Sequence, residues 1–86
     1  MTEYKIEFRP IARHNLRSLP KTIQKRIDIL LLSLTENPRP RGVKKLKGIE
    51  YRWSLRSGDY RIVYEIHDDR LIVLVIDIDH RRQVYR

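Results

Sequence analysis

The chain has 86 residues, no cysteine and a formal net charge of +8. This length allows one domain, residues 1–86, around one small core, and the absence of cysteine excludes disulfide bonds, a thiolate nucleophile and Cys-ligated zinc. The lack of disulfides fits a reducing cytoplasm, and the N-terminal segment is unlike a signal peptide. The longest apolar run, residues 71–76, is too short to cross a bilayer. We therefore predict a cytoplasmic protein that does not cross a membrane.

Most of the positive charge lies in the middle of the chain. Residues 39–61 carry eight Lys or Arg side chains against two acidic ones, a net of +6, whereas residues 62–86 carry a net of −1. A clustered excess of positive charge attracts polyanions, so the pattern favours a nucleic-acid partner. A solvated surface and an acidic protein partner are the two other interpretations.

The N-terminal half predicts one strand and two helices. Residues 4–8 alternate between apolar and polar, as in a half-buried strand. Residues 10–18 predict a short helix, and a second helix follows with Ser18 as its cap, Pro20 in its first turn and Asn37-Pro38 at its end. The second helix has five apolar residues at the spacing of one helical face: Ile23, Ile27, Leu30, Leu31 and Leu34.

The C-terminal half predicts a basic connector and three strands. Residues 39–49 form the connector, and strands are expected at residues 51–56, 60–66 and 71–78, the first two joined by a hairpin turn at residues 57–59. The last strand is apolar on both faces and therefore belongs inside the sheet. The predicted fold class is α+β, in the order β-α-α-β-β-β, with a helical hairpin covering a sheet.

Several side chains suited to phosphate binding fall on one predicted sheet face. Arg52 and Arg56 share a face because strand side chains alternate, and the turn at Gly58 brings Arg61 onto that face in a suitable register. Residues 79–86 then supply an imidazole, guanidinium groups and a phenol. Guanidinium groups bind phosphate oxygens bidentately, so these residues predict a site for a nucleic-acid backbone.

No metal or other cofactor is predicted. The three histidines lie far apart in the sequence and lack the spacing of metal ligands. Asp68-Asp69 is more typical of a turn, and Asp77 and Asp79 stand close to arginines that neutralise them. The sequence also has no glycine-rich loop of the phosphate-cradling kind.

Three blocks of the sequence, KKLKG, YRWSLRSGDYRIVYEI and VLVIDIDHRRQVYR, resemble the RelE branch of the RelE/ParE toxin superfamily of type II toxin–antitoxin systems. The resemblance covers nearly the whole chain. It implies an antiparallel-rich sheet with two N-terminal helices packed on one face. It also implies a toxin that cuts translated mRNA in the ribosomal A site, inhibits translation and is neutralised by a RelB-like antitoxin.

The resemblance also implies roles for individual residues. Arg61 matches the arginine on the scissile phosphate, Arg81 matches the arginine of the C-terminal tail, and Tyr85 matches the C-terminal catalytic tyrosine. Arg52 and Ser54 occupy positions where well-known members carry two catalytic lysines. The remaining basic residues are expected to hold mRNA and the rRNA of the 70S ribosome: Lys44, Lys45, Lys47, Arg52, Arg56 and Arg82.

The departure from the family pattern at residues 52 and 54 concerns proton transfer. The implied reaction needs no metal: the ribose 2′-OH attacks the adjacent phosphate, and the 5′-oxygen leaves with a proton from an acid. Arginine hardly deprotonates, so Arg52 is a poor proton donor. His80 can give or take a proton near neutral pH and is the predicted substitute, while a packing or phosphate-binding role for His80 fits the sequence equally well.

Two alternative functions remain open at this point. A ParE-like inhibitor that binds DNA gyrase without cutting RNA would have the same fold, since fold does not fix function. A plain nucleic-acid-binding module would also use the basic segment. The combination of His80 and Tyr85 with a basic tail favours the RelE-like endoribonuclease over both.

Overall fold

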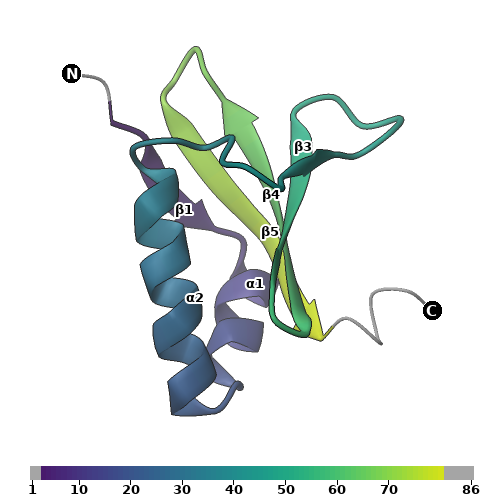
Figure 1. Cartoon of the computed structure of the whole chain (residues 1–86). Coiled ribbons are helices and arrows are strands. Elements are labelled where there is room, and N and C mark those ends of the chain that lie inside the picture. Colours follow the sequence, from purple (N-terminus) through teal and green to yellow (C-terminus); the bar gives the residue numbers. More distant parts are fainter. Residues whose placement is uncertain (1–2, 81–86) are drawn as a thin grey trace.

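In the computed structural model, which describes residues 3–80, two helices pack with one five-stranded sheet (Figure 1). The elements are β1 (Lys5–Phe8), α1 (Pro10–Arg17), α2 (Lys21–Leu34), β2 (Lys44–Lys45), β3 (Arg52–Ser57), β4 (Tyr60–His67) and β5 (Ile72–His80). The predicted α+β class is confirmed. The predicted order lacked β2, because the connector contains a two-residue strand that pairs with β3.

The sheet has the order β1-β5-β4-β3-β2 and is mostly antiparallel. The pair β1–β5 is parallel, and the other three pairs are antiparallel. β5 therefore has a neighbouring strand on each side, as expected of a strand inside the sheet. α1 continues past the end of β1 and lies beside β5, where the side-chain amide of Asn15 donates to Asp77 Oδ1 at 2.8 Å (Figure 1).

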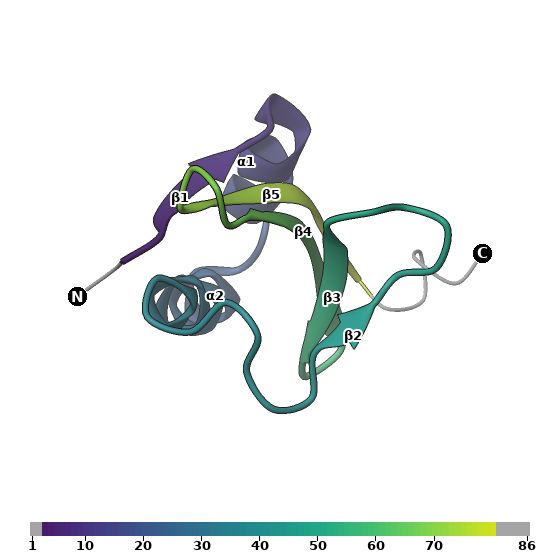
Figure 2. The ribbon, with the colours of Figure 1, turned by 90° about the horizontal axis from the view of Figure 1, so that it is seen from above.

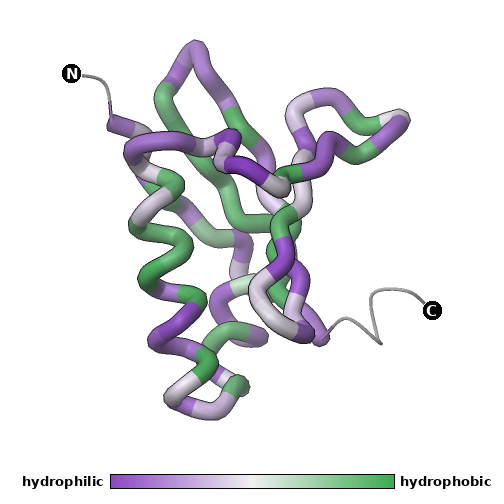
Figure 3. Tube along the Cα trace, viewed as in Figure 1, coloured by the Kyte–Doolittle hydropathy of each residue, from purple (hydrophilic) through white to green (hydrophobic). Residues whose placement is uncertain are grey.

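α2 lies in the concavity of the curved sheet (Figure 2). Hydrophobic residues gather along α2 and the central strands, whereas the segment after α2 is largely hydrophilic (Figure 3). The buried residues of α2 are Ile27, Leu31 and Leu34. They share one core cluster with seven residues of the sheet: Leu55, Ile62, Tyr64, Ile66, Val73, Val75 and Ile78. Burying one such side chain stabilises the fold by about 1.5–3 kcal/mol, so this cluster is the main source of stability.

The predicted cap of the second helix is wrong. Ser18 Oγ donates to the carbonyl of His14 at 2.9 Å, so Ser18 closes α1 instead of opening α2. α2 begins after Pro20 and has no side-chain cap, because Ser18 lies two residues before the N-cap position. The helix ends at Leu34, before the predicted stop at Asn37-Pro38. No helix within residues 3–80 has the length and apolar character needed to cross a membrane.

Two sets of hydrogen bonds hold the segment after α2 against the sheet. The hydroxyl of Tyr64, a fully buried residue of β4, donates to the carbonyl of Pro38 at 2.8 Å. Arg39 donates to both carboxylate oxygens of Asp68, at 3.2 and 2.8 Å, and the hydroxyl of Tyr4 donates to Asp68 at 2.5 Å. The path of the chain from α2 to β2 is therefore fixed at its start.

Candidate nucleic-acid interface

The strand register brings basic residues together on the sheet face opposite the core. Arg56 on β3 lies directly opposite Arg61 on β4, and Lys44 on β2 lies directly opposite Ser54 on β3. Their chain neighbours Leu55 and Ile62 point into the core, so alternation places these polar side chains on the other face. The expected shared face of Arg56 and Arg61 is confirmed.

These residues surround a small hollow. Gly42, Lys44, Ser54, Arg56 and Arg61 line a cavity of about 40 Å³, and Ser54, with a relative exposure of 5 %, is the buried member of the lining. Gly42 has a φ of +92°, which favours glycine, and its turn leads into β2, which pairs with β3. Three cationic side chains around one hollow create a local positive potential suited to a phosphate group.

Arg52 shares this face but is engaged with an acidic neighbour. Its Nε donates to Glu65 Oε2 at 3.0 Å, and Glu65 Oε1 lies 2.9 Å from His67 Nε2. Burial raises the pKa of Glu65, but the hydrogen bonds from His67 and Arg52 outweigh burial and hold this pKa below its usual value. The His67 ring in turn lies 5.3 Å from the ring of Tyr51. Arg52 is thus positioned by an ion pair at one end of the face.

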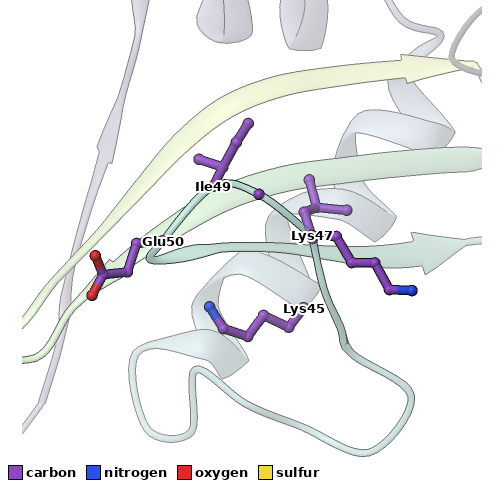
Figure 4. Close-up of a pocket in the computed structure, with 6 residues that line it drawn as sticks. Lys45, Lys47, Ile49 and Glu50 are labelled. Carbon is purple, nitrogen blue, oxygen red and sulfur yellow. The ribbon is translucent and has the colours of Figure 1, made fainter.

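Lys45 and Lys47 lie in a different place: Lys45 ends β2, and Lys47 is on the loop between β2 and β3. Residues 45–50 line a hollow of about 450 Å³. Figure 4 shows Lys45 and Lys47 pointing away from each other, with Ile49 and Glu50 further along the loop. Lys45 Nζ lies 5.6 Å from the centroid of the Trp53 ring, close enough for a cation–π interaction. This loop offers both charge and apolar surface, a combination suited to RNA.

His80 lies at the end of β5, directly opposite Tyr60 at the start of β4. The two rings pack edge to face, with centroids 5.2 Å apart. Asp79, not His80, is the residue opposite Arg61. The structure therefore brings Arg56 and Arg61 together, whereas His80 and Tyr60 lie at the same end of the sheet on its other face, the one that carries the core residues Ile62 and Ile78.

Three predicted site residues, Arg81, Arg82 and Tyr85, lie outside the described residues, and their roles stay predictions. Within residues 3–80, no three His, Asp or Glu side chains gather as they would around a metal ion. Among the described carboxylates, Asp77 accepts hydrogen bonds from Asn15 and from the backbone N–H of Ile78. Asp79 accepts one from the backbone N–H of His80.

Sequence reasoning missed the proximity of Lys44 to Ser54, Arg56 and Arg61. Lys44 belongs to a strand of two residues, which is too short to show any periodicity in its hydrophobic pattern. The one available signal was Gly42, since a glycine shortly before a pair of lysines marks a possible turn back onto the sheet.

Comparison with known proteins places the chain in a family. Residues 3–85 match the family described as the ParE toxin of the type II toxin–antitoxin system parDE. The chain is 32 % identical over 82 residues to the mRNA interferase toxin RelE of Escherichia coli K12, covering 93 % of this chain and 85 % of that protein. It is 30 % identical over 84 residues to toxin RelG of Mycobacterium tuberculosis, covering 96 % of this chain and 97 % of that protein.

Solved structures of toxin–antitoxin complexes also contain chains that are similar to this one. The toxin–antitoxin complex RelBE2 of Mycobacterium tuberculosis contains a chain that is similar with a TM-score of 0.80 and 31 % identity, covering 93 % of this chain and all of that one. The RelE–RelB complex of Pyrococcus horikoshii contains one with a TM-score of 0.82 and 28 % identity, covering 94 % and 97 % of the two chains. This protein therefore belongs to the family of RelE- and ParE-type toxins of type II toxin–antitoxin systems.

Proposed function

We propose that this toxin is a ribosome-dependent endoribonuclease that cuts translated mRNA in the ribosomal A site and so inhibits translation. The observation that carries the proposal is the hollow lined by Lys44, Arg56 and Arg61 on the open face of the sheet. The name of the relative from Escherichia coli, an mRNA interferase, supports the same reaction.

The proposed reaction is a transesterification without a metal ion. The ribose 2′-oxygen bonds to the adjacent phosphorus, and the bond from phosphorus to the 5′-oxygen breaks. Arg61 and Arg81 stabilise the extra negative charge on the phosphorus oxygens, with Arg56 next to Arg61 as a further cation. Tyr85 completes the proposed catalytic group. The 2′-OH proton passes to water, because the pairing of His80 with Tyr60 places the imidazole on the other face of the sheet.

We propose that cleavage depends on the ribosome because arginines dominate this site. Guanidinium groups stabilise charge but transfer protons poorly, so a site of this kind gains most when its substrate is held in a reactive orientation. An mRNA held in the A site is oriented in this way. Lys45, Lys47 and Arg82 then bind mRNA and rRNA around the cleavage site, whereas Arg52 is paired with Glu65.

The proposed partner outside the ribosome is a RelB-like antitoxin, as in the solved RelE–RelB complexes. A net charge of +8 favours an acidic or amphipathic segment that covers the basic face. Both partners then act in the cytoplasm, where translation takes place. Affinity purification of the tagged toxin together with the product of the adjacent reading frame tests this, and a toxin that purifies alone and stays active in its presence contradicts it.

Gyrase inhibition is the second candidate function, and the match to the ParE toxin family favours it. A ParE-like action would block DNA gyrase and leave mRNA intact. The hollow lined by arginines on the sheet is better suited to phosphate chemistry than to an interaction with a protein surface, so we rank this candidate second.

Mapping of RNA ends after brief induction separates the two functions. The endoribonuclease produces new 5′ ends within translated codons, and these ends disappear in Arg61→Ala, in Tyr85→Phe and after translation is blocked. The gyrase inhibitor instead produces DNA breaks with no new RNA ends. The exposed α2 variant Lys25→Ala serves as the control and should cleave like the wild type. Cleavage by both site variants at the wild-type level would refute the assigned site.

A further inference from the structure

Two consecutive lysines on β2 have different surroundings. Lys45 lies opposite Trp53 and places its ammonium group over that ring. Lys44 lies opposite Ser54 and lines the hollow with Arg56 and Arg61. Because neighbouring side chains on a strand point to opposite faces, the pairing of β2 with β3 separates the two lysines and directs Lys44 alone of the pair to the hollow.

The groups around the hollow differ in their ability to donate a proton. The guanidinium groups of Arg56 and Arg61 stay protonated in proteins and are poor proton donors. The hydroxyl of Ser54 is a much weaker acid than an ammonium group. Lys44 therefore offers the most suitable acid among the described residues that line the hollow.

The location of Lys44 also suits a reacting phosphate. A phosphate held by the two arginines lies in the same hollow that Lys44 lines, so the ammonium group approaches from the β2 side while the guanidinium groups bind from β3 and β4. Ser54, the residue opposite Lys44, is buried and lines the same hollow.

We propose that Lys44 is a catalytic residue that protonates the leaving 5′-oxygen, an inference that rests on the proposed endoribonuclease function. In this step the 2′-oxygen bonds to phosphorus, the bond between phosphorus and the 5′-oxygen breaks, and a proton moves from Lys44 Nζ to that oxygen. The 2′-OH proton passes to water. Lys44 then regains a proton from water, and the products are a 2′,3′-cyclic phosphate and a 5′-hydroxyl.

Lys44→Arg provides a direct test because it keeps the charge and loses the proton donor. In a single-turnover assay with mRNA on programmed 70S ribosomes, we expect the cleavage rate to fall by about 10²–10⁴-fold, the range of one general acid. The toxin concentration at half-maximal rate should stay close to that of the wild type, because binding depends on charge. The exposed α2 variant Lys25→Arg should behave like the wild type.

A modified substrate distinguishes proton donation from a structural effect. When sulfur replaces the 5′-oxygen at the scissile bond, the thiolate leaves without a proton, so Lys44→Arg should cleave this mRNA at nearly the wild-type rate. A Lys44→Arg rate close to wild type on the normal mRNA, or an equally large defect on the sulfur substrate, overturns the proposal. If the wild-type protein cleaves neither substrate on the ribosome, the endoribonuclease function itself is wrong.

Discussion

The carboxylate of Asp68 joins three parts of the chain that are distant in sequence. It accepts hydrogen bonds from Arg39, in the segment after α2, and from the hydroxyl of Tyr4, just before β1. The bonds from Arg39, followed by that from Tyr4, lower the pKa of Asp68. The hydrogen bond to Asp68 raises the pKa of Tyr4, and Arg39 opposes this rise only in part.

This carboxylate makes the stability of the fold dependent on pH. Because the pKa of Asp68 is lower in the folded chain, its contribution is present above the ordinary value of 3.8 and is lost as the pH falls through the folded value. The Asp68 carboxylate is exposed, so we expect Asp68→Asn to cost about 0.2–1 kcal/mol at neutral pH and much less once the pH has fallen below the pKa of the folded chain. Urea unfolding, followed by the fluorescence of Trp53, measures both values.

Asp69→Asn is the matched control for this prediction. Asp69 follows Asp68 in the same exposed turn but takes no part in the hydrogen bonds with Arg39 and Tyr4. Its substitution should leave the free energy of unfolding unchanged within about 0.5 kcal/mol. Equal losses in the two variants would mean that the ion pair does not contribute.

At the scale of elements, the connector between α2 and β3 depends on one buried contact with the sheet. The hydroxyl of Tyr64 donates to the carbonyl of Pro38, and burial raises the pKa of this hydroxyl, so it remains a donor at neutral pH. Tyr64→Phe leaves the Pro38 carbonyl without this donor. We expect the free energy of unfolding to fall by about 1–3 kcal/mol.

Tyr51→Phe tests whether that loss comes from the buried hydroxyl. Tyr51 has a relative exposure of 52 %, so its hydroxyl is hydrated whether the chain is folded or not. The variant should change stability by less than about 0.5 kcal/mol in the same urea titration. If Tyr64→Phe is as stable as Tyr51→Phe, the contact with Pro38 does not hold the connector.

The elements that the sequence predicted well are those in which a hydrophobic period repeats. α2 carries apolar residues at five positions of one helical face, and β4 alternates over its whole length, so both were predicted close to their observed bounds. The two-residue turn Gly58-Asp59 also favours the pairing of Arg56 with Arg61. Periodicity and turn chemistry are local, and they are visible without tertiary structure.

Features that depend on distant contacts were not predictable in the same way. β2 is two residues long, and its pairing with β3 depends on the path of the connector, which Tyr64, Arg39 and Asp68 fix from elsewhere in the fold. The place of Lys44 beside Ser54 follows from that pairing. The role of Ser18 was mistaken because a cap depends on where the helix starts, and Leu19 and Pro20 come between Ser18 and the first turn.

At the scale of the whole molecule, the basic residues of the middle segment fall into two groups. Arg39 and Arg52 form ion pairs with Asp68 and Glu65 and so help to hold the fold together. Others lie on the open face or on the exposed loop, where Lys47 is an example. The formal charge of residues 39–61 therefore overstates the charge that is available to bind RNA.

The salt dependence of RNA binding shows which of the basic residues are available to bind RNA. Lys47→Gln and Arg39→Gln each remove one positive charge, so the long-range field of the protein changes equally in both. We expect Lys47→Gln to reduce the slope of log K against log salt concentration for a single-stranded RNA by about 0.7, the value for one released counterion, because Lys47 replaces a cation on the RNA. Arg39→Gln should change the slope much less, because Asp68 already neutralises Arg39. Fluorescence anisotropy across a series of KCl concentrations gives both slopes. Equal changes would mean that total charge, and not its arrangement on the fold, determines binding.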